Sequence, residues 1–168
     1  MAETASKTQI LLARLAVGLI VAFAVIGMAV YGFSAEVRQR IWQNLIERPT
    51  GPMTFRFILQ PIMASITAWR DGARDARTGR SPYFWTMLTN RSAVGGRLQE
   101  GLIATSRILL LGLVMDVIYQ VIVFDTFHPG EAAIISILLA FVPYLLLRGP
   151  FARVVAWWRA RESANDVQ

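Results

Sequence analysis

The sequence contains no cysteine, and His128 is its only histidine. Without cysteine the chain can form no disulfide bond, no thiolate metal site and no cysteine nucleophile. One histidine is too few for a zinc site of the His-rich kind. The sequence also lacks a P-loop, a dinucleotide-binding fingerprint and a G-x-S-x-G nucleophile motif. These absences predict a protein that is not an enzyme and that holds no cofactor or metal ion.

Charged residues are scarce in three stretches of the chain. Residues 15–33 and 132–147 carry no charge, and residues 108–124 carry only Asp116. A helix of about 20 apolar residues, rising about 1.5 Å per residue, crosses a hydrocarbon core of about 30 Å. With 55% hydrophobic residues and a mean hydropathy of +0.46, the chain is predicted to be an all-α integral membrane protein. We expect a single membrane domain, residues 1–168, with three transmembrane helices at these stretches.

The first apolar stretch, residues 15–33, has two features that bear on its role. Lys7 and Arg14 precede it, as in a signal peptide, but its length and the two stretches that follow favour a retained membrane anchor. Small residues on a span allow another helix to approach closely, either within the chain or in a dimer. The stretch has such residues at spacings of four and three, with a valine completing the stripe: Gly18, Ala22, Val25, Ala29 and Gly32.

Two segments with helical periodicity are predicted to lie in the membrane interface. Residues 53–78 have a wide apolar face and a basic polar face, and residues 151–162 repeat this pattern on a smaller scale. The uncharged run at residues 57–69 would span about 20 Å as a helix, which is short of the hydrocarbon core. We therefore expect three transmembrane helices plus these amphipathic interfacial helices. A turn at residues 148–150 is expected to separate the last span from the helix at 151–162.

Arginine placement predicts the orientation of the chain. Seven arginines lie in residues 70–107 and four follow residue 147, whereas residues 125–131 contain no lysine or arginine. The positive-inside rule then places the carboxyl terminus in the cytoplasm and, with three spans, the amino terminus outside. In the alternative, a four-span bundle, residues 53–69 also cross and both termini are cytoplasmic. The arginine count and the helix length favour three spans.

Asp116 is the ionisable side chain that lies deep in a predicted span. An intramembrane carboxylate costs about 2.5–3.5 kcal/mol on insertion scales, so it needs a partner, a proton or water. Tyr119 and Gln120 share its helical face, and Arg56 or Gln60 can reach it if their helix dips inward. This intramembrane polar patch is either a structural clasp between helices or a proton or cation site. The first and third spans contain no charged residue that would continue a transport path, which favours the clasp.

The formal net charge of +6 predicts an anionic partner. Because the arginines flank the apolar spans, anionic lipid headgroups are favoured over nucleic acid. The predicted headgroup contacts are Arg70, Arg74, Arg77, Arg80, Arg153 and Arg159. Beside the bilayer, we expect a membrane-protein partner or a homo-oligomer. The predicted function is that of an accessory or scaffolding protein, and the alternative is a small proton- or ion-coupled transporter or channel component centred on Asp116.

Several short runs of the sequence resemble a group of small bacterial inner-membrane proteins. The runs are ERPTGP (47–52), FRFILQP (55–61), DG (71–72), DARTGRSPYFW (75–85), DVIYQ (116–120) and YLLLRGP (144–150). The resemblance covers about residues 36–160. It implies a multi-pass protein of the bacterial inner (cytoplasmic) membrane. Because that group is uncharacterised, the resemblance implies no activity and no catalytic residue.

Overall fold

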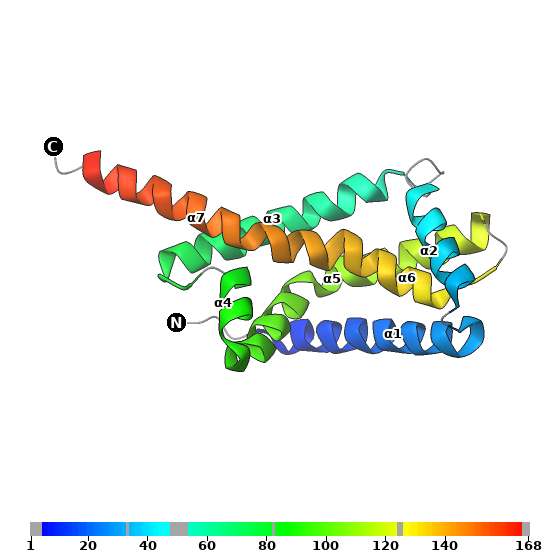
Figure 1. Cartoon of the computed structure of the whole chain (residues 1–168). Coiled ribbons are helices and arrows are strands. Elements are labelled where there is room, and N and C mark those ends of the chain that lie inside the picture. Colours follow the sequence, from blue (N-terminus) through cyan, green and yellow to red (C-terminus); the bar gives the residue numbers. More distant parts are fainter. Residues whose placement is uncertain (1–4, 33, 48–53, 82, 124–125, 166–168) are drawn as a thin grey trace.

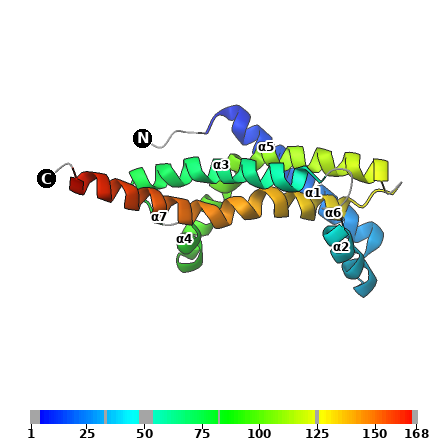
Figure 2. The ribbon, with the colours of Figure 1, turned by 90° about the horizontal axis from the view of Figure 1, so that it is seen from above.

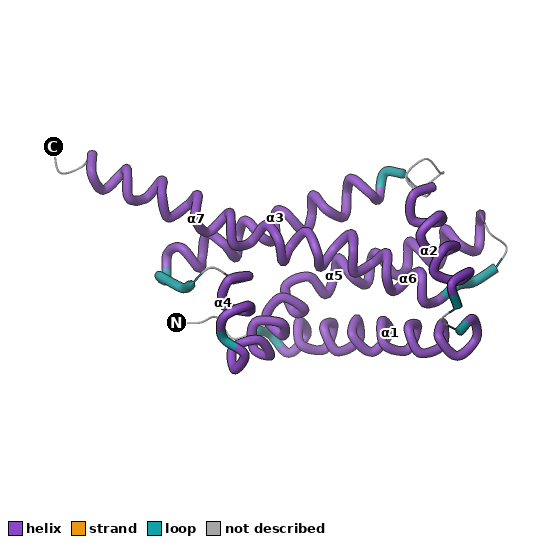
Figure 3. Tube along the Cα trace, viewed as in Figure 1, coloured by secondary structure: helices purple, strands orange, loops and turns teal. Residues whose placement is uncertain are grey.

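The computed structural model describes residues 5–32, 34–47, 54–81, 83–123 and 126–165. This part of the chain is helical and contains no β-strand (Figure 3). In chain order the elements are α1 (Lys7–Tyr31), α2 (Ala35–Glu47), α3 (Arg56–Arg77), α4 (Tyr83–Thr89), α5 (Arg91–Val123), α6 (Pro129–Ser136), the π-helix η2 (Ile137–Phe141) and α7 (Val142–Asn165). The all-α prediction is confirmed.

Three helices are long and apolar enough to cross a membrane. They are α1 with 25 residues, α5 with 33 residues, and the continuous helix of α6, η2 and α7, which has 34 residues from Pro129 to Glu162. The predicted spans at residues 15–33, 108–124 and 132–147 fall on these helices, with three exceptions. Gly32 follows the end of α1, and Phe33 and Phe124 lie outside the described residues. For these three elements, an uninterrupted apolar stretch is therefore enough to predict a long helix from the sequence.

The last helix continues where the sequence predicts a break. Residues 148–150 do not form a turn, and α7 runs through them, so residues 151–162 are not a separate helix. Just before Pro143, the N–H of Val142 donates to the carbonyl of Ile137, five residues earlier, within η2. A proline ring clashes with the carbonyl four residues back in a regular α-helix, and the wider π-turn relieves that clash. The π-helix thus lets one helix continue past the proline.

Helices α1 and α5 run in the same direction, and both termini of the chain lie at one end of the bundle (Figure 1). Near the start of α1, Gln9 lines the same groove as Ile103 of α5. Near its end, the Tyr31 hydroxyl donates to the Phe127 carbonyl at 2.8 Å. The expected three-span path has α1 and α5 running in opposite directions, whereas the structure places them in the same direction. The chain returns between them through α3.

Helix α3 packs lengthwise along α7 rather than lying apart from it (Figures 1 and 2). Its buried residues are Arg56, Gln60, Ala64, Ala68, Gly72 and Asp75. Its exposed large apolar residues are Ile58, Leu59, Ile62, Ile66 and Trp69, with Phe55 just before the helix. The expected interfacial helix at residues 53–78 is thus a helix, although Met53 lies outside the described residues. It packs against the long helices, because small residues let α7 approach and α5 supplies a partner for Arg56.

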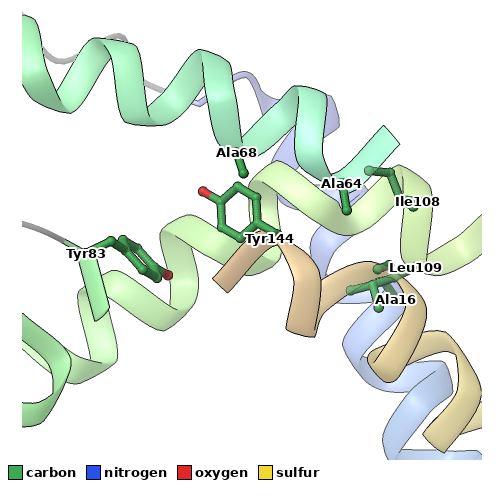
Figure 4. Packing of buried hydrophobic residues seen from close by; sticks show 8 residues of the cluster. Ala16, Ala64, Ala68, Tyr83, Ile108, Leu109 and Tyr144 are labelled. Atoms are coloured by element: carbon green, nitrogen blue, oxygen red, sulfur yellow. The ribbon is translucent and has the colours of Figure 1, made fainter. Parts of the chain in front are cut away.

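The packed centre of the molecule brings together side chains from six elements (Figure 4). The buried cluster comprises Ala16, Ala64, Ala68, Tyr83, Ile108, Leu109, Ala140 and Tyr144. Alanines on α1, α3 and η2 keep the helices close, so that backbones rather than long side chains approach one another. At one edge of the cluster, the rings of Tyr83 and Tyr144 meet edge to face with 6.0 Å between centroids.

Gly72 allows a close approach of α3 to α7, and its substitution is predicted to be destabilising. A Cβ atom there would lie 2.7 Å from the Arg148 carbonyl oxygen and 3.0 Å from the Ala152 nitrogen. Because both are backbone atoms, Gly72→Ala should push the helices apart and lower the free energy of unfolding by about 1–3 kcal/mol. Unfolding of the purified protein in mixed detergent micelles measures this change.

Gly95→Ala provides the matched control. No atom lies within 4 Å of the Cβ position at Gly95, which is inside α5. An alanine there should stabilise the helix by about 0.5–1 kcal/mol, because glycine loses more backbone entropy on folding. Two glycine variants with the same stability would contradict the close packing at Gly72.

Candidate functional site

The predicted polar patch on α5 contains a buried ion pair. The Arg56 Nη2 atom of α3 lies 2.7 Å from Asp116 Oδ1, and the two side chains are 1% and 0% exposed. The Arg56 guanidinium also lies over the Tyr119 ring, 4.9 Å from its centroid. Charge-assisted contacts at this distance are strong. Because both side chains are buried, neither charge can be stabilised by water instead. We call this pair the α3–α5 clasp.

Gln120 connects the α3–α5 clasp to the segment that follows α5. Its Nε2 donates to Asp116 Oδ2 at 2.6 Å and to the His128 carbonyl at 3.2 Å, and its Oε1 accepts from the His128 N–H at 2.6 Å. The His128 ring lies against the Tyr31 ring of α1, with 4.8 Å between centroids. These contacts hold α1, α3, α5 and the start of α6 together at one end of the bundle.

Gln60 lies one turn beyond Arg56 on α3 and is 1% exposed. Its amide makes no hydrogen bond within the described part of the chain. The amide lies against Gly112, where a Cβ atom would be 3.3 Å from Gln60 Nε2. The next buried positions of α3 are Ala64 and Ala68. All five predicted patch residues thus lie at the contact of α3 with α5, and the buried face of α3 is apolar from Ala64 to Gly72.

A second buried charge cluster, which the sequence did not predict, lies near the other end of α3. Arg148 of α7 donates from Nε to Asp75 Oδ2 at 2.8 Å and from Nη2 to Asp75 Oδ1 at 3.1 Å. It also donates to Glu100 Oε1 at 2.8 Å and to the Tyr144 hydroxyl at 2.7 Å. The Tyr144 hydroxyl donates in turn to Asp71 Oδ2 at 2.7 Å. We call this set the Arg148 cluster.

Two further arginines complete the Arg148 cluster. Arg80 lies 3.2 Å from Glu100 and 3.7 Å from Asp75, and Arg97 lies 3.5 Å from Glu100 and 3.9 Å from Asp75. Three arginines therefore face three carboxylates, counting Asp71. A balanced cluster lowers the cost of burying Asp75 and Arg148, each 1% exposed.

Tyr83 of the short helix α4 also contacts the Arg148 cluster. The Arg148 guanidinium lies over the Tyr83 ring, 4.3 Å from its centroid. The Tyr83 hydroxyl donates to the Arg97 carbonyl. Burial raises the pKa of the Tyr83 hydroxyl to about 12, so it remains a neutral donor at physiological pH. This side chain therefore fastens the short helix α4 to α5 and α7.

The sequence did contain two signals for the Arg148 cluster. Arg148 follows an uncharged stretch directly, and Asp71 and Asp75 are spaced by four residues, which places them on one face of α3. Each aspartate is 73 residues from its partner along the chain, Asp71 from Tyr144 and Asp75 from Arg148, so only the fold brings them together.

The predicted headgroup arginines have two different environments. Arg80 belongs to the Arg148 cluster and is 46% exposed. The other five are exposed on α3 and α7, and the structure does not gather them into one site: Arg70, Arg74, Arg77, Arg153 and Arg159.

The two charge clusters are separated by about the thickness of a hydrocarbon core. Asp75 lies 19 residues after Arg56 on α3, which corresponds to about 28 Å along the helix axis. Between them, the exposed side of α3 is apolar as far as Trp69 and then carries Arg70 and Arg74, while its buried face is built from Gln60, Ala64, Ala68 and Gly72. Buried charges are thus confined to the two ends of this interval on α3.

The arrangement of these side chains is that of two structural clasps. In the described residues no group of three or more histidine, aspartate or glutamate side chains is placed to hold a metal ion.

Comparison of the chain with family models, with curated proteins and with solved structures gives no match. The function must therefore be argued from the geometry of the chain itself.

Proposed function

We propose that this chain is a non-enzymatic, multi-pass membrane protein that acts by association, as an accessory or scaffolding subunit seated on anionic lipid. The observation that carries this proposal is the exposure of α1. In its most apolar window only 11% of the residues are buried, against 44% in α5 and 39% in the α6–α7 helix. A membrane helix with so little contact to its own chain has most of its surface available to lipid or to another helix.

The exposed surface of α1 includes its small-residue stripe. All five members are exposed: Gly18, Ala22, Val25, Ala29 and Gly32. Packing within the chain uses another face of α1, where Ala13, Ala16 and Gly27 are buried. A Cβ atom at Gly27 would lie 2.7 Å from the Gly130 nitrogen of α6. Among the described residues, the stripe therefore does not take part in packing within the chain. This supports the other interpretation, a contact with a helix of another protein or of a second copy.

We infer that α3 crosses the bilayer as a fourth segment. Apolar side chains such as Ile58, Ile62 and Ile66 face outward, whereas the charged Arg56 and Asp75 are buried, as expected for a helix with lipid on one side and packed helices on the other. The exposed arginines of α3, Arg70, Arg74 and Arg77, lie toward its arginine-rich end. The parallel directions of α1 and α5 also require a return crossing between them. By the positive-inside rule, the arginine-rich end that contains both termini faces the cytoplasm, and a bacterial inner membrane is the proposed location.

Proton or ion movement at Asp116 is the competing proposal. It is supported by the hydrogen bonds that lead from Asp116 through Gln120 to His128, which is half-buried. Against it, Arg56 neutralises the carboxylate at 2.7 Å. Transport needs a series of polar groups across the bilayer, whereas the buried residues of α3 between Gln60 and the Arg148 cluster are Ala64, Ala68 and Gly72. The geometry favours the clasp.

Enlarging the small-residue stripe tests the proposed association. We expect Gly18→Leu and Ala22→Leu to abolish co-purification of a stoichiometric membrane-protein partner, or of a second copy, from native membranes in mild detergent. Bulky side chains on the stripe prevent the close approach of the second helix. Mass spectrometry of the purified complex identifies the partner and its stoichiometry.

Val30→Leu is the matched control, because Val30 is 65% exposed and lies about 120° around α1 from Gly18. This control should retain the partner. Co-purification that is insensitive to all three substitutions would contradict the assignment of the stripe. A chain that is monomeric and without partner in native membranes would overturn the proposed function.

A further inference from the structure

A groove between α3 and α5, bordered by the start of α1, combines exposed arginines with apolar walls. It consists of two hollows of ≈ 330 Å³ and ≈ 500 Å³ that share four lining residues: Gln9, Thr67, Ile103 and Ala104. The larger hollow is also lined by Arg70 of α3 and Arg107 of α5, and the smaller by Arg74. Arginines from two different helices therefore face one hollow.

The larger hollow is lined by both arginine and apolar side chains. Arg70 lies near the arginine-rich end of α3, and Met63 lies two turns further toward the middle of the bundle. Ile66 and Ile108 also line this hollow. Arg70 and Met63 are separated by about 10 Å along the helix, so this hollow offers both charged and apolar contacts, as the two parts of a phospholipid require.

The acidic residues of the groove have partners elsewhere. Asp71 and Glu100 line the smaller hollow, but Asp71 accepts from Tyr144 at 2.7 Å and Glu100 accepts from Arg148 at 2.8 Å. Among the described residues that line the larger hollow there is no acid. The positive charge of Arg70 and Arg107 is therefore not balanced within that hollow.

The first turn of α1 adds to the positive potential of the groove. Gln9 closes a capping box with Ser6, which fixes the turn where it borders both hollows. The amino-terminal end of a helix carries a partial positive charge, and α1 has no acidic residue in its first turn. An anion in the groove is attracted by this end as well as by the arginines.

We propose that this groove binds one anionic glycerophospholipid. Its phosphate lies between Arg70 and Arg107, whose planar guanidinium groups suit phosphate oxygens, and its acyl chains follow Met63, Ile66 and Ile108. The inference rests on the proposed function, because it requires the bundle to sit in a bilayer with this end at the headgroup level. Whereas the proposed function requires only a general attraction to anionic lipid, this inference places one lipid molecule at one site.

Lipid retention by the purified full-length chain tests the site. Native mass spectrometry is used to count phosphatidylglycerol and phosphatidylcholine molecules that remain bound as each lipid is titrated. Wild type should retain one phosphatidylglycerol at concentrations where it retains no phosphatidylcholine. Arg70→Gln/Arg107→Gln should weaken that retention about 30-fold, the combined effect of two arginines near an anionic headgroup.

The control variant is Arg91→Gln/Arg161→Gln, which removes the same charge from exposed positions on α5 and α7 that are not among the predicted headgroup contacts. It should retain phosphatidylglycerol like wild type. If both double variants lose affinity equally, the attraction is diffuse and the site is overturned. Equal retention of the two lipids by wild type would overturn it as well. All four substitutions are at exposed side chains, so loss of folding is not expected to obscure the result.

Two further measurements separate the possible failures. Inorganic phosphate should not displace phosphatidylglycerol, because the acyl chains contribute to binding; displacement would show that free phosphate is the ligand and overturn the lipid site. Alkaline carbonate should not extract the protein from native membranes. Extraction would overturn the proposed function together with the lipid site, whereas an inserted chain without lipid preference would overturn the lipid site alone.

Discussion

Substituting Asp116 with asparagine is expected to lower the free energy of unfolding by about 3 kcal/mol. The reason is that Arg56 would keep its positive charge at a position that is 1% exposed, with no carboxylate at 2.7 Å to compensate it. Asparagine retains the size of the side chain and an oxygen that can accept from Gln120. The loss therefore reports on the charge, and unfolding in mixed detergent micelles measures it.

Two comparison variants isolate the ion pair. Arg56→Met/Asp116→Leu removes both charges and should lose less stability than Asp116→Asn, since apolar side chains can replace a buried ion pair at small cost. Glu162→Gln makes the same chemical change at an exposed position of α7. It should stay within about 0.5 kcal/mol of wild type.

The same Asp116 variant separates the clasp from an ion or proton site. If Asp116 is a clasp, liposomes containing wild type or Asp116→Asn should show the same background proton flux. A pH-driven flux in wild type that Asp116→Asn abolishes without loss of stability would contradict the clasp. It would support the competing proposal of ion or proton movement.

Replacing Arg148 with methionine is expected to cost about 3–5 kcal/mol of unfolding free energy. The substitution removes the guanidinium that donates to Asp75, Glu100 and Tyr144. Asp75 is 1% exposed and would retain only the more distant Arg80 and Arg97, at 3.7 and 3.9 Å. We expect α3 and α7 to separate at this end in the same micelle unfolding experiment, which limited proteolysis of the loop before α4 would also detect.

Arg153→Met is the matched control for Arg148→Met. It makes the same substitution five residues later on α7, at an exposed position, and should change stability by no more than about 0.5 kcal/mol. Asp75→Asn/Arg148→Met should be less destabilised than Arg148→Met alone, because the buried carboxylate is removed with its partner. A loss at Arg153 equal to that at Arg148 would indicate a general effect of arginine removal.

Local sequence patterns predicted the parts of the molecule that depend on nearby residues. The apolar stretches marked the three long helices, since length and hydropathy are properties of a contiguous segment. The spacing of Asp116, Tyr119 and Gln120 correctly placed them on one face of α5, because helical periodicity fixes which residues are neighbours. Arg56 and Gln60 were anticipated only under the condition that their helix turned inward.

The surroundings of helix α3 could not be predicted from its local sequence pattern. An apolar face opposite an arginine-rich face predicts a helix at the membrane surface, yet the same pattern also suits a helix with lipid on its apolar side and charged partners on the other. Its amino-acid sequence alone cannot distinguish the two, because the difference lies in Asp116 and Arg148, which belong to other helices. The Arg148 cluster was missed for the same reason.

By itself, the sequence determined an all-helical chain with three helices long and apolar enough to cross a membrane, and an acid that needs a partner inside one of them. The tertiary structure alone decided the direction of α1 relative to α5 and the burial of Gln60 on α3. It also decided the pairing of Arg56 with Asp116 and of Arg148 with Asp75. The physical reason is that hydropathy and periodicity act over a few helical turns, whereas charge pairing acts between segments that meet only after the helices pack.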